Sequence, residues 1–427
     1  MEVKRNFWVG WLLLGALTFA AGCGQRPGKG GPVEIKVTFW GSPEEIDIIT
    51  HSIEGWQAAH PDMKVIFEHT PYTGYDSKIL TRIAGGAAPD IITTEVNYFV
   101  TFASKRVLED LTGFVEKDPD FRLSDFFPQI IDRFTAQGKF YAVPRDVAPF
   151  ASVFYNKELF DQAGIPYPTD DWTWDDLLRT ARALTKKDAS GRITQYGFYG
   201  WAWKNFVYGN GGALVDDIKN PTQTRITDPK TIAGLQFYAD LPNLYEVAPT
   251  PLALSNLGMG VDTLFASGRL AMFLSGIWET PLLRNYKFRW DVAMFPKNSE
   301  GIRAFGTGGS GYAILRSSKH KKEAWEVIKA LTGEEGQARL AERGLAQPAR
   351  IAVAQGEYWA RHPAPPAHKE MLNEAVKYIV FDPFHPRWRE IEDKYLLPAF
   401  EQVFTGKKTA EEVARELETK INAVLKS

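Results

Sequence analysis

The chain has 427 residues, of which 44% are hydrophobic and 24% charged, a composition typical of a globular protein and unlike that of a disordered chain. Its formal net charge of −2 argues against nucleic acid or an anionic membrane surface as the main partner. The seven histidines show no paired spacing of the kind that metal ligands have, so we expect neither a metal nor a cofactor.

The N-terminal segment resembles an export signal. A charged start precedes an apolar run at residues 7–21, and Cys23, the only cysteine, follows it. The run is roughly 15 residues long, too short to cross a hydrocarbon core of ~30 Å comfortably. We expect residues 1–22 to be a signal peptide, Cys23 to carry a lipid, and residues 23–32 to form a flexible linker.

The cleavage site departs from a bacterial lipobox at one position, because Ala20 stands where that motif usually has leucine. Two alternatives stay open: ordinary signal-peptidase cleavage near Ala20 or Ala21, and an uncleaved anchor. All three place the rest of the chain outside the cytoplasm. A single cysteine excludes an intramolecular disulfide, so packing alone must hold the exported part together.

The stretch that follows the linker alternates between strand and helix patterns. Period-2 alternation predicts a strand at 33–39, and further strands are expected at 63–67 and 89–92. Helical patterns at 46–56 and 75–83 separate them. This order predicts an α/β domain with a mainly parallel sheet, in which ligands bind beyond the carboxyl ends of the strands.

The remainder of the chain continues the mixture of strands and helices. Capping-box patterns, Ser/Thr followed three residues later by an acidic residue, predict helix starts at Thr173, Thr332 and Thr409. A helix is also expected at 261–266. Further strands are predicted at 139–144, 151–156, 270–274, 290–295 and 311–315.

Seven segments span nearly the whole chain after the linker, at 37–41, 86–91, 138–144, 153–160, 265–272, 276–278 and 317–325. In this order they resemble the extracellular solute-binding proteins of ABC importers, in the carbohydrate-binding family that includes maltose-binding protein. The resemblance implies an α/β, two-lobed periplasmic-binding-protein-like fold of type II, with a ligand cleft and a hinge. It implies an N-terminal lobe of residues 33–146 plus 297–333, and a C-terminal lobe of residues 147–296 plus 334–427.

The same resemblance implies a function in uptake and no catalysis. We expect a monomer, attached to the membrane by lipid, that binds a carbohydrate between two closing lobes and delivers it to the permease subunits of the importer. The 13 tryptophans favour a neutral oligosaccharide, because aromatic rings stack on the apolar faces of sugars. The alternatives are an exported glycoside hydrolase and a binding protein for another solute, such as a glycerol phosphate.

The candidate ligand-binding residues come from two sources. Loops at the ends of the first and third strands, together with the family's register, give Trp40, Ser42, Glu45, Thr94, Glu95 and Asn97. The resemblance adds residues around the first crossing segment and in the second lobe: Asp146, Phe150, Trp201, Trp203, Gly276, Trp278, Gly309 and Trp388.

Each candidate also has a structural interpretation. The tryptophans and Phe150 could pack in the core instead of facing ligand. Asp146 could form a hinge ion pair with Arg145, and the glycines at 308–311 could serve only to permit tight turns.

Overall fold

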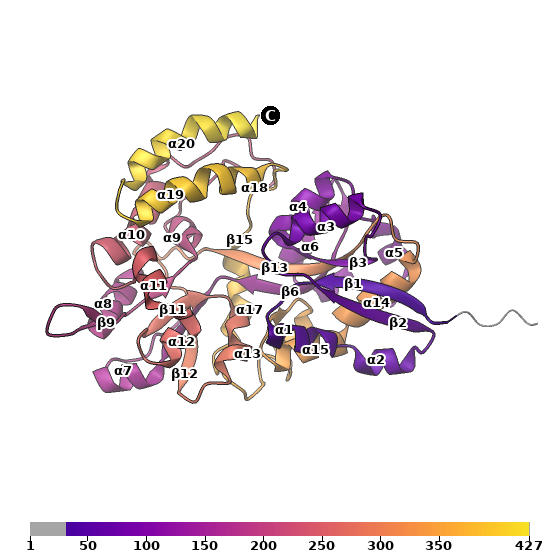
Figure 1. Ribbon diagram of the computed structural model, residues 1–427, viewed down its shortest axis with the longest axis horizontal. Helices are drawn as coiled ribbons and strands as arrows, with labels where there is room; N and C mark the ends of the chain where they lie inside the picture. The colour runs from indigo at the N-terminus through magenta and orange to yellow at the C-terminus, as the bar shows by residue number, and fades with distance from the viewer. Residues whose placement is uncertain (1–30, 427) are drawn as a thin grey trace, which may run out of the picture.

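The computed structural model describes residues 31–426 and consists of two α/β lobes side by side with a third, helical layer above them (Figure 1). The predicted signal peptide and the lipid-bearing Cys23 lie outside the described residues. Within residues 31–426, no helix has both the length and the apolar character needed to cross a bilayer.

The first lobe is built on a seven-stranded sheet. β1 pairs in parallel with β2 and β3, whereas β13 is antiparallel to β3 and β6. The strands, in their order across the sheet, are β14 (Gln347–Pro348), β6 (Val143–Pro149), β13 (Phe305–Ile314), β3 (Ile91–Glu95), β1 (Val33–Phe39) and β2 (Met63–His69), with β15 (Ile379–Val380) paired to β13.

The second lobe contains a four-stranded sheet in which the central strand β7 is antiparallel to both neighbours. Its order is β10 (Tyr199–Gly200), β11 (Met272–Ser275), β7 (Ser152–Asn156) and β12 (Trp290–Met294). Two short hairpins complete the strands: β4 (Thr135–Ala136) with β5 (Lys139–Phe140), and β8 (Lys186–Lys187) with β9 (Ile193–Gln195).

Helices cover both sheets. The helices that follow strands of the first sheet along the chain are α1 (Pro43–Thr50), α2 (Glu54–Ala59), α3 (Tyr75–Ala84), α4 (Val96–Ser104), α5 (Thr112–Lys117), α6 (Pro128–Arg133), α14 (Lys321–Thr332), α15 (Glu334–Glu342) and α16 (Ile351–Gln355). The second lobe has α7 (Lys157–Ala163), α8 (Trp174–Leu184), α9 (Trp203–Gly209), α10 (Pro229–Asn243), α11 (Pro251–Leu257), α12 (Val261–Ala266), α13 (Thr280–Leu283) and α17 (Met371–Ala375).

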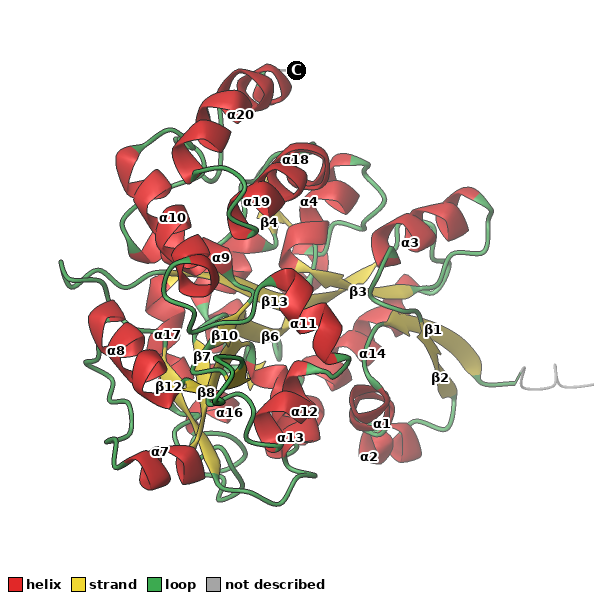
Figure 2. Cartoon of the chain, turned by 60° about the vertical axis from the view of Figure 1, so that its left-hand side comes forward, coloured by secondary structure: helices red, strands yellow, loops and turns green. Residues whose placement is uncertain are grey.

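The C-terminal helices form the third layer, beside α10 (Figure 2). They are α18 (Trp388–Ile391), α19 (Leu397–Phe404) and α20 (Ala410–Leu425), and they share with α9 and α10 a hydrophobic core separate from those of the two sheets. The apolar side chains along one face of α20, Val413, Leu417, Ile421 and Val424, are buried in that core.

Two strands connect the lobes. β6 contributes Val143 and Val147 to the core of the first sheet, and the chain then enters the second core at Ala151. β13 contributes Phe305 to the second core and Ile314 to the first, so one continuous strand runs through both lobes. In Figure 1, β13 extends from the second lobe across the middle of the molecule into the first.

The segment from 334 to 376 contributes to both cores rather than to the second alone. Ala349 and Ala354 are buried with the first sheet, and Trp359 and Leu372 with the second. The residue boundaries of the two lobes remain a prediction. This segment and β13 do not fit them simply, because each contributes residues to both cores.

The strand predictions are largely confirmed, and the exceptions have physical reasons. β13 begins six residues before the predicted 311 because its first half, whose glycines disfavour strands, is paired with β15 at Phe305 and Gly306 and with β6 from Thr307 onward. The predicted helix at 46–56 is two helices, since α1 ends at Thr50 and α2 begins at Glu54.

Two of the three predicted capping boxes are confirmed, at Thr173 and Thr409. The third is wrong: Thr332 lies in the last turn of α14 and donates its hydroxyl to the carbonyl of Ile328. Its expected partner Glu335 accepts instead from the backbone N–H of Gly55, at 2.9 Å.

Gly234 lies where α10 packs closely against the backbone of α9. A Cβ added there would lie 2.1 Å from the carbonyl oxygen of Phe206, a backbone atom that cannot move independently. We expect Gly234→Ala to lower the free energy of unfolding by about 1–3 kcal/mol through overpacking, measured by chemical denaturation. In Gly113→Ala, where the added Cβ meets nothing within 4 Å, we expect no loss. Equal stability of the two variants would contradict the prediction.

Candidate functional site: a ring-lined cleft between the lobes

Three neighbouring strands bring polar side chains to one level of the first sheet. In the register of the sheet, Ser310 of β13 stands opposite Glu95 of β3 on one side and Asp146 of β6 on the other. Trp40 follows directly on the end of β1, which pairs in parallel with β3. The carboxyl ends of β1 and β3 therefore meet the middle of the strands that cross between the lobes.

A cavity of about 860 Å³ opens at this level and is lined by residues from both lobes and from the C-terminal helices. The first lobe contributes Trp40, Gly41, Ser42, Glu45, Tyr72, Glu95, Asn97 and Tyr98. The crossing strands contribute Arg145, Asp146, Ala148, Gly308, Gly309 and Ser310, and the loop between β6 and β7 adds Phe150. The second lobe contributes Tyr199, Trp201, Ala202, Trp203, Lys204, Tyr238, Ile277 and Trp278. Leu345, Ala346, Asp382, Arg389, Glu392, Leu397 and Phe404 complete the lining.

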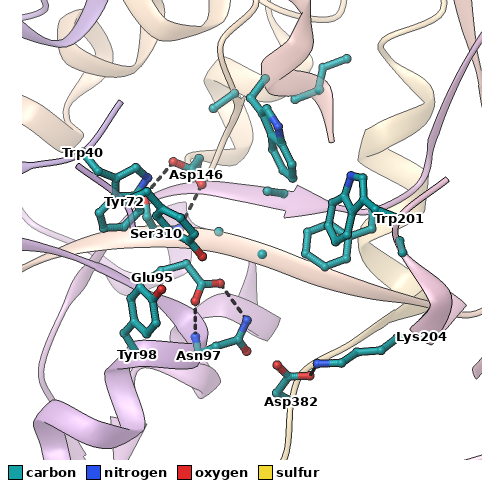
Figure 3. Close-up of a pocket in the computed structure, with 18 of the residues that line it drawn as sticks. Trp40, Tyr72, Glu95, Asn97, Tyr98, Asp146, Trp201, Lys204, Ser310 and Asp382 are labelled. Atoms are coloured by element: carbon teal, nitrogen blue, oxygen red, sulfur yellow. Dashed lines mark hydrogen bonds and ion pairs between the residues drawn. The ribbon is translucent and has the colours of Figure 1, made fainter. Parts of the chain in front are cut away.

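Aromatic rings stand on opposite walls of the cavity (Figure 3). On the first-lobe wall, the ring of Tyr72 lies 5.6 Å from Trp40 and 5.7 Å from Tyr98, between centroids. On the facing wall, Trp201 and Trp278 lie 6.3 Å apart with their planes tilted by 33°. Tyr72 is 49% exposed and Trp201 is 40% exposed, although large rings in a folded chain are normally buried.

The second-lobe rings are held in place by their neighbours. The ring of Trp278 lies over Gly276, where a Cβ would come within 1.8 Å of a ring carbon. The indole N–H of Trp201 donates to the hydroxyl of Ser275 at 3.3 Å, and that hydroxyl donates in turn to Glu279 at 2.8 Å. These contacts fix the ring planes before any ligand arrives.

Asp146 is a buried carboxylate with three partners in the crossing strands. It accepts from the N–H and the hydroxyl of Ser310, at 3.0 and 2.8 Å, and from Nε of Arg145 at 2.5 Å. The ion pair with Arg145 was the structural alternative for Asp146, and it is present together with a place in the cavity lining. Nη1 of Arg145 is buried and has no acceptor among the described residues.

Two helices of the first lobe begin at the cavity, and each is capped by a carboxylate of the chain. At α1, Ser42 and Glu45 form a capping box: the Ser42 hydroxyl accepts from the Glu45 N–H, and Glu45 accepts from the Ser42 N–H at 2.6 Å. At α4, Glu95 accepts from the N–H and the side-chain amide of Asn97, at 2.8 and 2.9 Å. Burial raises the pKa of Glu45, and it raises the pKa of Glu95 to about 8.

The floor of the cavity holds a buried ion triad. Nζ of Lys204, on α9, lies 2.5 Å from Asp382 and 2.5 Å from Glu392 of the C-terminal segment. Arg133 completes the group by donating to the backbone carbonyl of Asp382 at 2.9 Å. Burial raises the pKa of Glu392 despite the neighbouring ammonium. This triad ties the C-terminal helices to the second lobe and brings charge into the cavity lining.

Most of the residues proposed from the sequence are brought together in this lining. They are Trp40, Ser42, Glu45, Glu95, Asn97, Asp146, Phe150, Trp201, Trp203, Trp278 and Gly309. Trp203 is largely a core residue as well, since it is 7% exposed and its ring packs 4.8 Å from that of Phe400.

Three proposed residues are not placed in the lining. Thr94 is fully buried because alternate residues of a strand face opposite sides and Glu95 faces the cavity. Trp388 packs in the core of the C-terminal helices. Gly276 lies beneath the ring of Trp278, so it supports the wall without forming it.

The sequence reasoning missed Tyr72, Tyr98, Lys204, Asp382, Arg389 and Glu392. Tyr72 follows β2, whose carboxyl end lies at the same edge as those of β1 and β3, so the loop rule could have found it. Lys204 stands alone in an apolar stretch, which signals a buried ion pair. Its partners lie about 180 residues away, and nothing in the sequence identifies them.

Within residues 31–426, no group of three or more His, Cys, Asp or Glu side chains is arranged to hold a metal ion. The carboxylates of the cleft are instead bonded to backbone N–H groups, hydroxyls and cations, as described above.

Comparison with known proteins assigns the family. Residues 42–338 match the model of the bacterial extracellular solute-binding protein family. The ABC substrate-binding protein Lmo0181 of Listeria monocytogenes, solved in complex with cycloalternan, is 29% identical, with a TM-score of 0.83 over 92% of this chain and 99% of that one.

Two curated relatives extend the comparison. The arabinooligosaccharide-binding protein of Bacillus subtilis is 26% identical over 339 residues, which cover 75% of this chain and 74% of that protein. An uncharacterised lipoprotein in the oleD 5′ region of Streptomyces antibioticus is 26% identical over 426 residues, covering 93% and 88%.

The fold and the cleft are those of a periplasmic binding protein of mixed α/β type. The chain belongs to the bacterial extracellular solute-binding protein family, whose members are solute-binding components of ABC transporters and not enzymes.

The raised pKa of Glu95 has a consequence for stability. Because the folded protein keeps the Glu95 proton up to about pH 8, whereas the unfolded chain releases it near the ordinary value of 4.5, the contribution of Glu95 to stability is fully present below pH 4.5 and is lost as pH rises through 8. The facing groups Arg133, Lys204 and Asp382 are unchanged in Glu95→Gln. In the unsubstituted protein, Glu95 should make the free energy of unfolding fall by up to ~1.4 kcal/mol per pH unit between pH 5 and 8. We expect this part of the pH dependence to be absent from Glu95→Gln.

The measurement is chemical denaturation at a series of pH values. Glu116→Gln, which alters an exposed carboxylate outside the cavity lining, is the control and should keep the slope of the unsubstituted protein. A Glu95→Gln variant with the same slope as the control would show that Glu95 titrates normally.

Proposed function

We propose that this protein is the carbohydrate-binding component of an ABC importer, that it holds an oligosaccharide in the cleft between two closing lobes, and that it hands the sugar to the membrane permease. The observation that carries the proposal is the pair of facing aromatic walls. Figure 3 shows Trp40 and Tyr72 on one wall and Trp201 on the other. Trp278 lies beside Trp201, with 6.3 Å between the ring centroids.

The chemistry of the lining suits a polyhydroxylated ligand. Aromatic faces stack on the apolar faces of sugar rings, and buried carboxylates accept hydrogen bonds from hydroxyl groups. Glu45, Glu95 and Asp146 supply the acceptors, and Nη1 of Arg145 supplies a donor that has no partner within the described chain. The cavity volume of about 860 Å³ lies in the upper part of the usual range for small-molecule sites, which supports an oligosaccharide over a single sugar.

The relatives support the same class of ligand. The Listeria protein was solved with cycloalternan, and the Bacillus relative binds arabinooligosaccharide according to its name. Lobe closure follows from the placement of the walls: a ligand that contacts rings on both lobes binds the closed form better and shifts the population toward it.

Trp278→Ala tests the site. Removing one stacking ring from the centre of the cleft should weaken binding of the best ligand by about 30-fold or more, in the range of an interface hot spot. The measurement is a thermal-shift screen of neutral mono- and oligosaccharides, followed by titration calorimetry on the best hit, since a ligand that binds only the folded state raises the Tm.

Two further variants make this test specific. Gly276→Ala should weaken binding through displacement of the Trp278 ring. Trp56→Ala, which removes an indole from α2 outside the cavity, should leave the affinity unchanged. Unaltered affinity in Trp278→Ala would remove this ring from the site, and a complete lack of response to sugars would contradict the proposal itself.

We also propose that Cys23 carries the lipid that retains the protein at the outer face of the cell membrane. The sequence pattern at 7–23 and the lipoprotein relative of Streptomyces support this. In a bacterial host, Cys23→Ser should move the protein from the membrane fraction to the medium or periplasm and abolish incorporation of labelled fatty acid. Unchanged fractionation and labelling would favour one of the alternative leaders.

A further inference from the structure

Trp201 is the exposed ring of the second-lobe wall, and Figure 3 shows it standing free on the cavity side. Its indole is 40% exposed and contacts two other rings of the wall, Phe150 at 4.8 Å and Trp278 at 6.3 Å between centroids. A side chain on the surface exchanges between staggered rotamers unless its neighbours prevent it. The ring contacts are apolar, so the partner that holds the N–H edge of the indole comes from elsewhere.

That partner is Ser275, the last residue of β11. Nε1 of Trp201 can only donate, so the Ser275 oxygen accepts from it, at 3.3 Å. The hydroxyl of Ser275 then donates to Oε1 of Glu279, at 2.8 Å. Because Ser275 is only 2% exposed, water does not compete for its hydroxyl. The two hydrogen bonds form a relay in which Glu279 orients Ser275 and Ser275 orients Trp201.

Glu279 is an unfavourable residue for stability at this position. It is partly buried at the end of the short 3-10 helix Ile277–Glu279, and the charged neighbour that acts on it is Asp262, which has the same sign. Burial raises the pKa of Glu279. A carboxyl group in such surroundings costs folding free energy that an apolar side chain of similar length would not cost. Residues that break a packing rule in this way are expected where function requires them.

We propose that Ser275 and Glu279 are positioning residues of the cleft: they hold the Trp201 indole beside Trp278, so that the two rings present one stacking wall, and they raise ligand affinity without touching the ligand. Neither residue belongs to the cavity lining. The inference rests on the proposed function and deepens it. A ring that is already held in its bound orientation loses less conformational freedom when the ligand arrives, and the ligand binds more tightly for that reason.

The test is the double variant Ser275→Ala with Glu279→Met, called the relay variant. It removes both members of the Ser275–Glu279 hydrogen bond, so neither is left buried and unpaired, and such a change is close to neutral for stability. We expect its Tm without ligand to stay within about 3 °C of that of the unsubstituted protein. Its Kd for maltotriose or cellotriose, measured by calorimetry on the trisaccharide that binds, should rise about three- to tenfold, the effect of leaving one side chain to be immobilised on binding.

Near-UV circular dichroism tests the positioning itself, because fixed aromatic packing produces this signal. The contribution of Trp201 is the difference between the spectra of the unsubstituted protein and Trp201→Ala. Most of that contribution should be absent from the relay variant without ligand. A double-mutant cycle supplies the second measurement: when the relay substitutions are added to Trp201→Ala, no further affinity should be lost.

Two single variants complete the design. Glu279→Gln should retain both the affinity and the spectrum, because its amide oxygen still accepts from Ser275. Glu370→Met is the matched control, since Glu370 is an exposed carboxylate directly before α17 and outside the cavity lining. It should change neither measurement.

The outcomes separate this inference from the proposed function. Sugar binding with an unchanged Kd in the relay variant would overturn the inference and leave the carbohydrate function intact. An equal loss of affinity in the Trp201→Ala background, or a Glu279→Gln variant as weak as the relay variant, would also overturn it. A lack of response to every sugar would contradict the proposed function, whereas the dichroism comparison needs no ligand and still decides whether the relay holds Trp201.

Discussion

A single strand that belongs to two cores is the constraint on which the rest of this structure depends. β13 places Phe305 among the apolar residues of the second sheet and Ile314 among those of the first. Between these ends it is paired with β6, and over its second half also with β3. It is buried along its whole length. Because both lobes are built on this element, the level at which Ser310 lies between Glu95 and Asp146 is fixed, and the cleft forms there.

The composition of β13 follows from what lies next to it. Its glycines let the ring of Phe150 approach within 3.0 Å of where a Cβ of Gly306 would lie, and Gly309 adopts a positive φ of 125°. A strand of larger residues would keep that ring away from the backbone and displace the wall that Phe150 shares with Trp201 and Trp278. The same glycines of β13 therefore determine how the crossing strand packs and what shape the binding cavity has.

Sequence reasoning predicted the parts of the fold that local patterns encode. The period-2 alternation of β1 and the caps at Thr173 and Thr409 are each set by residues close in the chain. It failed where pairing with distant strands overrides local preference, as in the glycine-rich half of β13. It also failed at Thr332, where the sequence fits a capping box but the residue belongs to the last turn of the preceding helix α14. The predicted cleft loops after β1 and β3 line the cavity because strand order alone determines which ends meet.

The C-terminal helices share with α9 and α10 a core that is separate from those of the two sheets, yet Glu392, Leu397 and Phe404 form part of the cavity lining. The stretch of the groove beside them is therefore built from a unit whose interior is independent of both sheets. Substitutions or insertions in α18 and α19 can lengthen, shorten or block the groove while the crossing strands and the stacking rings stay as they are. The size of the binding groove can in this way change while the frame of the two sheets stays the same.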